Sequence, residues 1–102
     1  NKVILNNADA IIFTTNKLGV QGVQAIVNKG KRIPEDIAVI SFDDTAAYAV
    51  AKTSITAIKQ PVAQMCKEAV RILMKSMDKS ESNIDTEEVI LDVSFIIRES
   101  CP

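Results

Sequence analysis

The chain has 102 residues, of which 47% are hydrophobic and 25% are charged, and its formal net charge at pH 7 is −1. This composition is typical of a small soluble globular domain, or of one part of a larger protein, and it excludes a disordered or membrane-embedded chain. A near-neutral charge does not favour a nucleic-acid surface. The apolar runs are far shorter than the roughly 20 residues of a membrane-spanning helix, so we expect a cytoplasmic protein with no membrane partner.

Few residues carry reactive chemistry. The chain has no His, and Cys66 and Cys101 do not have the spacing of metal ligands. In so Cys-poor a sequence we expect two free thiols in a reducing compartment rather than a disulfide. We therefore expect neither a metal nor a cofactor. Because residue 1 is Asn and not Met, we expect the natural chain to begin earlier.

The first half of the chain has the pattern of a parallel α/β unit. Residues 9–14 form a short apolar run, which predicts a strand buried on both faces. A helix is expected from Asn16, a suitable N-cap, to Gly30, which stands where a glycine ends a helix. The expected sheet-facing stripe is Gly19, Gly22, Val23 and Ile26. Residues 37–42 predict a second strand buried on both faces, completing a strand–helix–strand crossover.

Polar residues follow both expected strands, residues 14–16 after the first and residues 43–45 after the second. Binding sites in parallel sheets lie just beyond the carboxyl ends of the strands. If the two strands are neighbours, both clusters lie at one edge, where carboxylates and amides can bind ligand hydroxyls. The alternative for Asp43 and Asp44 is a solvated turn in which an aspartate caps its own backbone.

The second half begins with a short β-branched segment at residues 55–58. Gln60-Pro61 then predicts a helix start, and a 3.6-residue period of apolar residues predicts a strongly amphipathic helix from Val62 to Met77. We expect its stripe to belong to a core: Val62, Met65, Cys66, Ala69, Val70, Leu73 and Met77. Residues 78–88 are a polar surface loop, and residues 89–100 contain two strand-like runs.

Four segments together resemble one family: "DAIIFTTN", "GVQAIVNKGKRIPEDIAVISFDDT", "ITAIKQPVAQMCKEAVRIL" and the closing "IIRES". They are similar to the C-terminal part of the lactose-repressor/galactose-repressor family of bacterial transcriptional regulators, over residues 9–100. The resemblance implies an α/β fold, part of a two-lobed periplasmic-binding-protein-like domain with parallel sheets flanked by helices. Residues 1–102 would be the C-terminal portion of its effector-binding domain, and the DNA-binding domain would lie outside this chain.

The resemblance also implies how the chain is divided and what it does. Residues 9–57 would belong mainly to the lobe distal from DNA and residues 60–91 mainly to the DNA-proximal lobe, with residues 93–100 returning to the distal lobe. The chain would sense a small-molecule effector, a sugar or related metabolite. As a homodimer, the whole regulator would bind operator DNA, and we expect a repressor in which the effector shifts the population of lobe arrangements.

Five effector-binding positions follow from the same resemblance. Asp43 matches the family's strand-end aspartate, which often bonds an effector hydroxyl or ring nitrogen. Thr15 and Asn16 stand where the family usually has Asn-Asp, so Thr15 offers a hydroxyl and Asn16 lacks the negative charge. Ile12 and Val62 match positions where members place an aromatic ring against the ligand, and both are aliphatic here.

The resemblance also implies a dimer interface, formed by the helix after the first strand and the loop at residues 46–52. The interface residues would be Val20, Gln24 and Val27 on the helix and Tyr48 in the loop. The alternative is that Val20 and Val27 are ordinary residues packed on the sheet.

Two other classes of protein are alternatives to a transcriptional regulator. A solute-binding protein of a sugar transporter shares the fold but would need a signal peptide. An enzyme using Asp43 and Asp44 as acid and base is disfavoured, because adjacent residues on an extended strand point to opposite faces. Without a His, a nucleophile elbow or a Gly-rich phosphate loop, we expect no enzyme.

Overall fold

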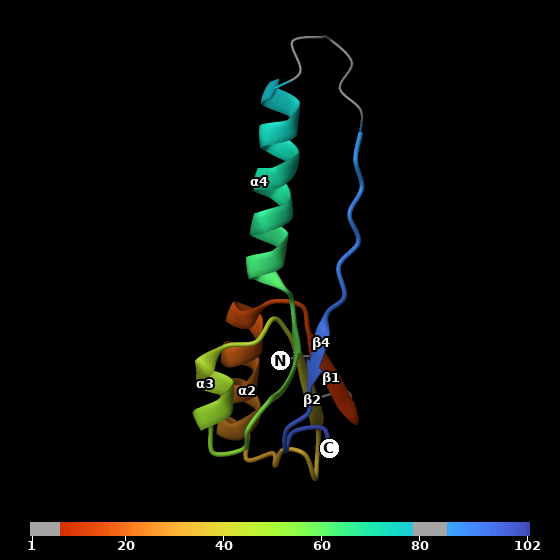
Figure 1. Cartoon of the computed structure of the whole chain (residues 1–102). Coiled ribbons are helices and arrows are strands. Elements are labelled where there is room, and N and C mark those ends of the chain that lie inside the picture. Colours follow the sequence, from red (N-terminus) through yellow and green to blue (C-terminus); the bar gives the residue numbers. More distant parts are fainter. Residues whose placement is uncertain (1–6, 79–85) are drawn as a thin grey trace. The chain divides into compact units, whose positions relative to one another are not determined.

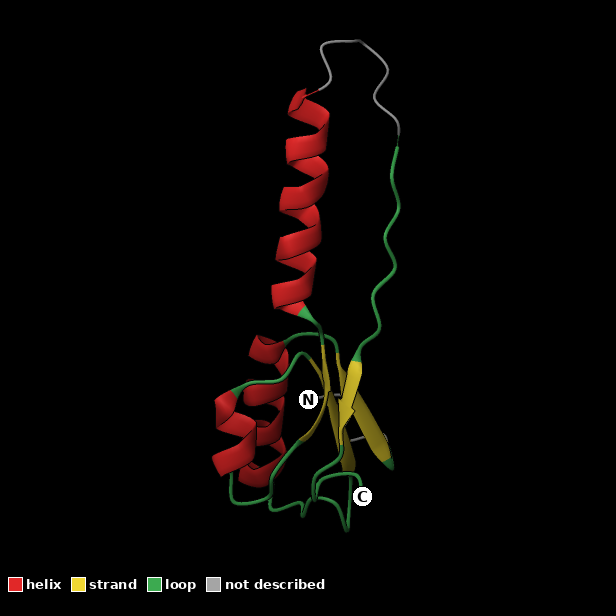
Figure 2. Ribbon diagram, in the orientation of Figure 1, coloured by secondary structure: helices red, strands yellow, loops and turns green. Residues whose placement is uncertain are grey.

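The computed structural model describes residues 7–78 and 86–102. These residues form two compact units, one comprising the chain up to Lys59 together with Ser94–Pro102, and the other comprising Gln60–Val93. The first unit contains β1 (Ala10–Phe13), α2 (Asn16–Asn28), β2 (Ala38–Phe42), α3 (Ala46–Val50), β3 (Thr56–Lys59) and β4 (Ser94–Ile96). The second contains α4 (Val62–Asp78). Figure 1 colours these elements along the sequence, and Figure 2 colours them by type.

The first unit is built on one four-stranded sheet with the order β1-β2-β3-β4. β1, β2 and β3 run parallel, and β4 is antiparallel to β3. In this register Ile12 stands opposite Ile40, and Ile58 stands opposite Phe95. The structure therefore confirms the predicted α/β class and the predicted pairing of the first two strands.

One face of this sheet carries the core. α2 and α3 both lie on that face (Figure 1). Val39 and Ser41 of β2 and Ala57 of β3 point into it and are fully buried. The buried apolar residues form a single cluster: Ile26, Ile33, Ile37, Val39, Tyr48, Ile55 and Ala57.

The opposite face of the sheet is open within the described residues. β1 alternates between exposed and half-buried positions, and Ile12 is 65% exposed. Phe95 of β4 is likewise exposed on this face, opposite Ile58. The prediction that the first strand is buried on both faces is therefore wrong for this chain by itself, because its helices cover one side only.

Two glycines let α2 approach its neighbours closely. A Cβ on Gly22 would lie 2.1 Å from Cζ of Phe13, so the ring packs directly on the helix backbone. A Cβ on Gly19 would meet the hydroxyl of Tyr48 at 2.0 Å. Gly19 and Ile26 are buried, and Gly22 and Val23 are half-buried, so the predicted stripe is confirmed as the sheet-facing side.

The ends of α2 correct one prediction and confirm another. The N-cap is Thr15, whose Oγ1 accepts a hydrogen bond from the amide of Leu18 at 3.3 Å, and Asn16 is the first helical residue. A residue at the N-cap needs extended backbone, which Thr15 has at φ −144°. At the other end Gly30 has φ +71°, the left-handed conformation expected of a glycine just after a helix.

The described part of the second unit contains α4 and residues 86–93, which precede β4 in the chain. As predicted, the helix begins directly after Gln60-Pro61, and the amide of Met65 donates to the carbonyl of Pro61 at 2.9 Å. Arg71 forms ion pairs with Glu68 and Glu87. No residue of α4 is buried, so the stripe predicted to be core has no cover within the described residues.

The last part of the chain contains less strand than expected. Residues 86–93 have no regular secondary structure, and only Ser94–Ile96 forms a strand. Residues 79–85, most of the predicted polar loop, lie outside the described residues. None of the helices formed by residues 7–78 and 86–102 is long and apolar enough to cross a membrane.

Candidate functional site

The candidate site lies at the carboxyl edge of the sheet. β1 and β2 are parallel neighbours, with Phe13 opposite Ser41, so the residues that follow these strands emerge at the same edge. Thr15 and Asn16 come after β1, and Asp43 comes after β2. The structure thus brings together three of the five predicted effector residues.

Asp43 has an unusual backbone conformation. Its φ is +71°, in the left-handed region that only a few non-glycine residues adopt, Asp and Asn among them. Its amide donates to the carbonyl of Ile58 at 2.9 Å, which ties the end of β2 to β3. Left-handed backbone costs about 1–2 kcal/mol, and such residues are concentrated at ligand sites where the surroundings hold them.

Asp44 has a different role. Its two carboxylate oxygens accept from Nη1 and Nη2 of Arg98 at 2.8 and 3.0 Å, a bidentate pair in which both side chains are less than one-fifth exposed. The hydrogen bonds from Arg98 hold the pKa of Asp44 below its usual value, and they raise the pKa of Arg98. The Asp44 carboxylate is therefore bound within the fold.

Asn16 presents an unsatisfied group at this edge. Its Oδ1 is buried, and no group among the described residues donates a hydrogen bond to it. Leaving a buried acceptor unpaired costs about 1–3 kcal/mol, so a donor from a bound molecule would find a favourable place here. The main-chain carbonyl of Asn16 is satisfied, because the hydroxyl of Tyr48 donates to it at 3.3 Å.

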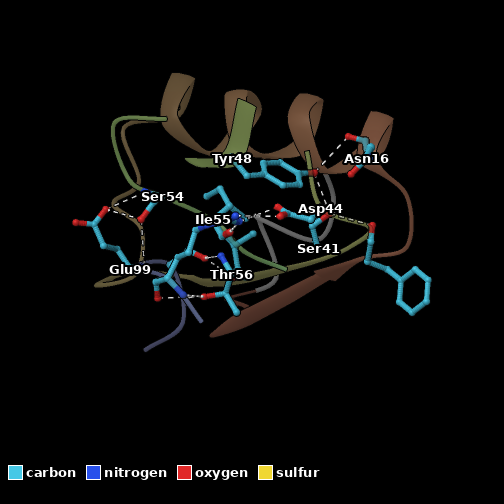
Figure 3. Close-up of polar contacts among 12 residues, drawn as sticks. Asn16, Ser41, Asp44, Tyr48, Ser54, Ile55, Thr56 and Glu99 are labelled. Atoms are coloured by element: carbon cyan, nitrogen blue, oxygen red, sulfur yellow. Dashed lines mark hydrogen bonds and ion pairs between the residues drawn. The ribbon is translucent and has the colours of Figure 1, made fainter. Parts of the chain in front are cut away.

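Tyr48 joins this edge to the core (Figure 3). Its hydroxyl also lies 2.8 Å from Oγ of Ser41, inside β2. The side chain is 2% exposed and belongs to the core cluster. The prediction that Tyr48 lies in a dimer interface is therefore corrected: it is in the short helix α3, and its ring points inward against α2 rather than out to a partner.

The remaining predicted effector residues lie elsewhere. Ile12 projects from β1 on the open face of the sheet. Val62 is the first residue of α4 and belongs to the second unit, where it is exposed. Thr15 is at the site's edge, but its Oγ1 already serves as the cap of α2.

The three other predicted interface residues all lie on the outer side of α2. Val20 and Val27 are 45% and 53% exposed, so the alternative that they pack on the sheet is wrong. Gln24 is also exposed and donates to Oδ1 of Asn28 at 2.8 Å. Gln24 and Val27 line one wall of a groove of about 520 Å³, whose other wall includes residues 51–53.

The closing "RES", residues 98–100, makes structural hydrogen bonds that the sequence did not predict. Oε2 of Glu99 accepts from the amide and the hydroxyl of Ser54, both at 2.9 Å, which lowers the pKa of Glu99 (Figure 3). Ser100 Oγ donates to the carbonyl of Val39 at 2.6 Å and accepts from the amide of Thr56 at 2.8 Å. The feature of the sequence that could have indicated these contacts is the position of three polar residues directly after an apolar strand-like run.

The described residues show no group of three or more His, Cys, Asp or Glu side chains arranged to hold a metal ion. Cys66 and Cys101 are both free, one on α4 and the other near the end of the first unit. What the carboxyl edge offers is hydrogen bonding: a carboxylate at Asp43 and an unpaired amide oxygen at Asn16.

Comparisons with known proteins agree with this fold. Residues 3–101 match the family described as periplasmic binding protein-like domain. The HTH-type transcriptional regulator CelR of Thermobifida fusca is 26% identical over 94 residues, which are 92% of this chain and 27% of that protein. The ribose operon repressor of Haemophilus influenzae is 29% identical over 91 residues, 89% of this chain and 27% of that protein.

A solved structure gives the same result. A LacI family transcriptional regulator from Lactobacillus casei with bound sucrose has a TM-score of 0.73 and 28% identity, covering 91% of this chain and 33% of that one. The chain thus spans 27% to 33% of the length of these three relatives. The match over residues 3–101 and the agreement in fold show that the chain belongs to the family of periplasmic-binding-protein-like domains, and the relatives named above are transcriptional regulators.

Proposed function

We propose that this chain is the C-terminal portion of the effector-binding domain of a cytoplasmic transcriptional regulator, a repressor whose operator affinity changes when a sugar or related metabolite binds. The observation that carries the proposal is the carboxyl edge of the sheet, where Asp43 and the unpaired Oδ1 of Asn16 follow two adjacent parallel strands. One relative of the same fold holds sucrose, and two others are a regulator and a repressor.

The chemistry of this edge suits a hydroxyl-rich ligand. Sugar hydroxyls can donate to the Asp43 carboxylate and to Asn16 Oδ1, and the second of these bonds would satisfy an acceptor that is otherwise buried and unpaired. Thr15, Ile12 and Val62 are the further candidate contacts, of which the last two would offer aliphatic surface. With one Tyr, three Phe and no Trp, the chain provides little aromatic surface for stacking.

The division of the chain supports a two-lobed arrangement. The two compact units divide at Lys59–Gln60 and at Val93–Ser94. We assign residues 9–57 mainly to the lobe distal from DNA, residues 60–91 mainly to the DNA-proximal lobe, and residues 93–100 to the return. The open sheet face and the uncovered stripe of α4 would then pack against parts of the regulator outside this chain, in keeping with the greater length of the relatives.

The regulator would act as a homodimer. The outer side of α2 carries exposed Val20, Gln24 and Val27, and two-fold pairing suits a protein that reads a symmetric operator. The DNA-binding domain would lie outside this chain. The relatives named above are regulators, which favours this function over a transporter's solute-binding protein and over an enzyme.

The protein translated from the complete reading frame provides the test. Duplexes that it binds would be selected from a random DNA pool, and binding would then be measured by fluorescence anisotropy with and without ribose, glucose, sucrose and cellobiose. We expect salt-sensitive, sequence-specific binding that one of these sugars changes. Failure to select any DNA site, or turnover of a bound sugar, would contradict the proposal.

A further inference from the structure

We propose that Arg98 is a positioning residue for the effector site, which it serves by fixing Asp44 and thereby the backbone of Asp43. The inference rests on the proposed function for the identity of the site, but the contacts that support it are independent of any ligand. Arg98 lies just after β4, 54 residues from Asp44 in the sequence. No contact with the effector is required of it.

Arg98 joins three segments of the first unit. Its guanidinium donates to both carboxylate oxygens of Asp44, and Nη1 donates also to the carbonyl of Ile55 at 2.7 Å. Its own amide donates to Oγ1 of Thr56 at 2.9 Å, so the main chain of Arg98 is held in place. Figure 3 labels the three residues that Arg98 contacts: Asp44, Ile55 and Thr56. The end of β2, the start of β3 and the residues after β4 are thus tied to one side chain.

Asp43 is a residue that needs such support. Its left-handed φ of +71° is held on the amino side by the bond from its amide to Ile58. On the carboxyl side the next residue is Asp44, whose carboxylate is bound by Arg98. Strained backbone persists only where the surrounding contacts over-determine it. Without Arg98, the restraint that acts through Asp44 is lost.

The chain contains a matched ion pair that is far more exposed. Arg32 also forms a bidentate pair, donating from Nε and Nη2 to the two carboxylate oxygens of Asp36 at 3.1 and 2.9 Å. The Arg32 side chain is 70% exposed, and the two residues are only four apart. Exposed pairs of this kind contribute little to structure, whereas a bidentate pair shielded from water fixes geometry. Arg32→Ala is therefore the control for Arg98→Ala.

The experiment uses the protein translated from the complete reading frame, in the wild-type form and as Arg98→Ala, Arg98→Lys, Asp44→Asn and Arg32→Ala. Amide hydrogen exchange is resolved to single residues at Asp43 and Val39, and calorimetry measures the affinity for ribose, glucose, sucrose and cellobiose. Val39 is the internal reference, because its amide is held by the carbonyl of Ser100 at 3.0 Å.

We expect Arg98→Ala to speed exchange at Asp43 by about tenfold and to leave exchange at Val39 within about twofold. Affinity for the bound sugar should fall by about threefold or more. Adding Asp44→Asn to Arg98→Ala should cause no further loss, since Arg98→Ala already removes the pair. Arg98→Lys keeps the charge but not the fork, so it should recover part of both effects. Arg32→Ala should change neither.

Each outcome decides the inference. Unchanged exchange at Asp43 in Arg98→Ala overturns it, whichever sugar binds. Faster exchange with unchanged sugar affinity shows that Arg98 shapes the loop without serving the site, which also overturns it. If the wild-type protein binds none of the four sugars, the proposed effector class fails, and the exchange data still decide whether Arg98 holds Asp43. If Arg98→Ala does not fold, Asp44→Asn and Arg98→Lys give the same comparison with less loss of packing.

Discussion

The phenol oxygen of Tyr48 occupies the place where a side chain at Gly19 would begin, since a Cβ on Gly19 would lie 2.0 Å from it. From there the hydroxyl reaches Oγ of Ser41 at 2.8 Å and the carbonyl of Asn16 at 3.3 Å. One buried side chain on α3 therefore connects the core strand β2 with the first turn of α2. The first turn of α2 is where the unpaired Oδ1 of Asn16 is presented.

Gly19→Ala should destabilise the first unit. The added methyl group would also lie 2.7 Å from Oγ of Ser41, so both Tyr48 and Ser41 would have to move. Overpacking of this kind costs about 1–3 kcal/mol in the free energy of unfolding, which urea denaturation followed by circular dichroism would measure. Gln21→Ala, exposed on the same helix, is the control and should change stability by less than about 0.5 kcal/mol. Equal stability of the two variants would mean that Tyr48 can leave the Gly19 backbone freely.

The Asp44–Arg98 pair should make the free energy of unfolding depend on pH in the acid range. The pKa of Asp44 is lowered in the folded state from an ordinary value of 3.8. A lowered folded pKa contributes stability that is fully present above pH 3.8 and is lost as pH falls through the folded pKa, because the unfolded chain takes up its proton first. Urea unfolding at a series of pH values from about 2.5 to 7 measures this dependence. Asp44→Asn should be less stable than wild type near neutral pH, and it should lose less stability than wild type below about pH 4. Parallel pH profiles for the two proteins would show that the ion pair has no part in acid stability.

The 102-residue chain alone should not bind DNA specifically. It has a net charge of −1, and its described helices contain no pair arranged as a helix-turn-helix. In gel-shift titrations with the duplexes selected by the complete protein, the chain should give no salt-sensitive, sequence-specific complex. A specific shift by the chain alone would contradict the assignment of DNA binding to a domain outside it.

The same chain should associate in solution. α4 exposes Val62, Met65, Val70, Leu73, Met74 and Met77. Removing each large apolar side chain from water is worth roughly 1.5–3 kcal/mol, so copies of the chain should cover these surfaces for one another. Light scattering should report a mass above that of the monomer, and Leu73→Lys with Val70→Lys should lower it. Gln64→Glu, exposed on the same helix, is the control. A monodisperse wild-type monomer would show that the open faces do not drive association.

Local patterns predicted the elements of this fold well. The strand–helix–strand unit, the glycine after α2 and the start of α4 all depend on residues within a few positions of one another, where periodicity and capping preferences act. The helix start was misplaced by one residue because Thr15 and Asn16 are both good N-caps, and only backbone conformation distinguishes them. The proposed effector residues came from the family resemblance and a general rule about strand ends, which the sheet order satisfies.

The rest of the site depends on distant partners. Nothing near Asp44 in the sequence indicates Arg98, which is 54 residues away, and the roles of Glu99 and Ser100 depend on Ser54, Thr56 and Val39. Tyr48 is surrounded in sequence by alanines and lies in a helix of five residues, too short for a periodic signal. Its burial follows from the gap at Gly19, a tertiary feature.

Asp43→Asn should impair effector binding more than any other single amide substitution in this chain. The side chain keeps its size and its tolerance of the left-handed backbone, so the loop should keep its shape while losing a charge and an acceptor. Hydrogen bonds to a charged group contribute about 1.5–3 kcal/mol each, so affinity should fall by about tenfold or more in calorimetric titration of the complete protein with its bound sugar.

Asp44→Asn acts only through the backbone of Asp43 and can still accept one bond from Arg98, so it should lose less. Asp36→Asn, paired with Arg32 away from this edge, is the control and should leave affinity unchanged. Operator binding without sugar should stay near wild type in all three variants, because the proposed DNA-binding domain would lie outside this chain. Normal sugar affinity in Asp43→Asn together with a large loss in Asp44→Asn would show that the two carboxylates have the opposite roles.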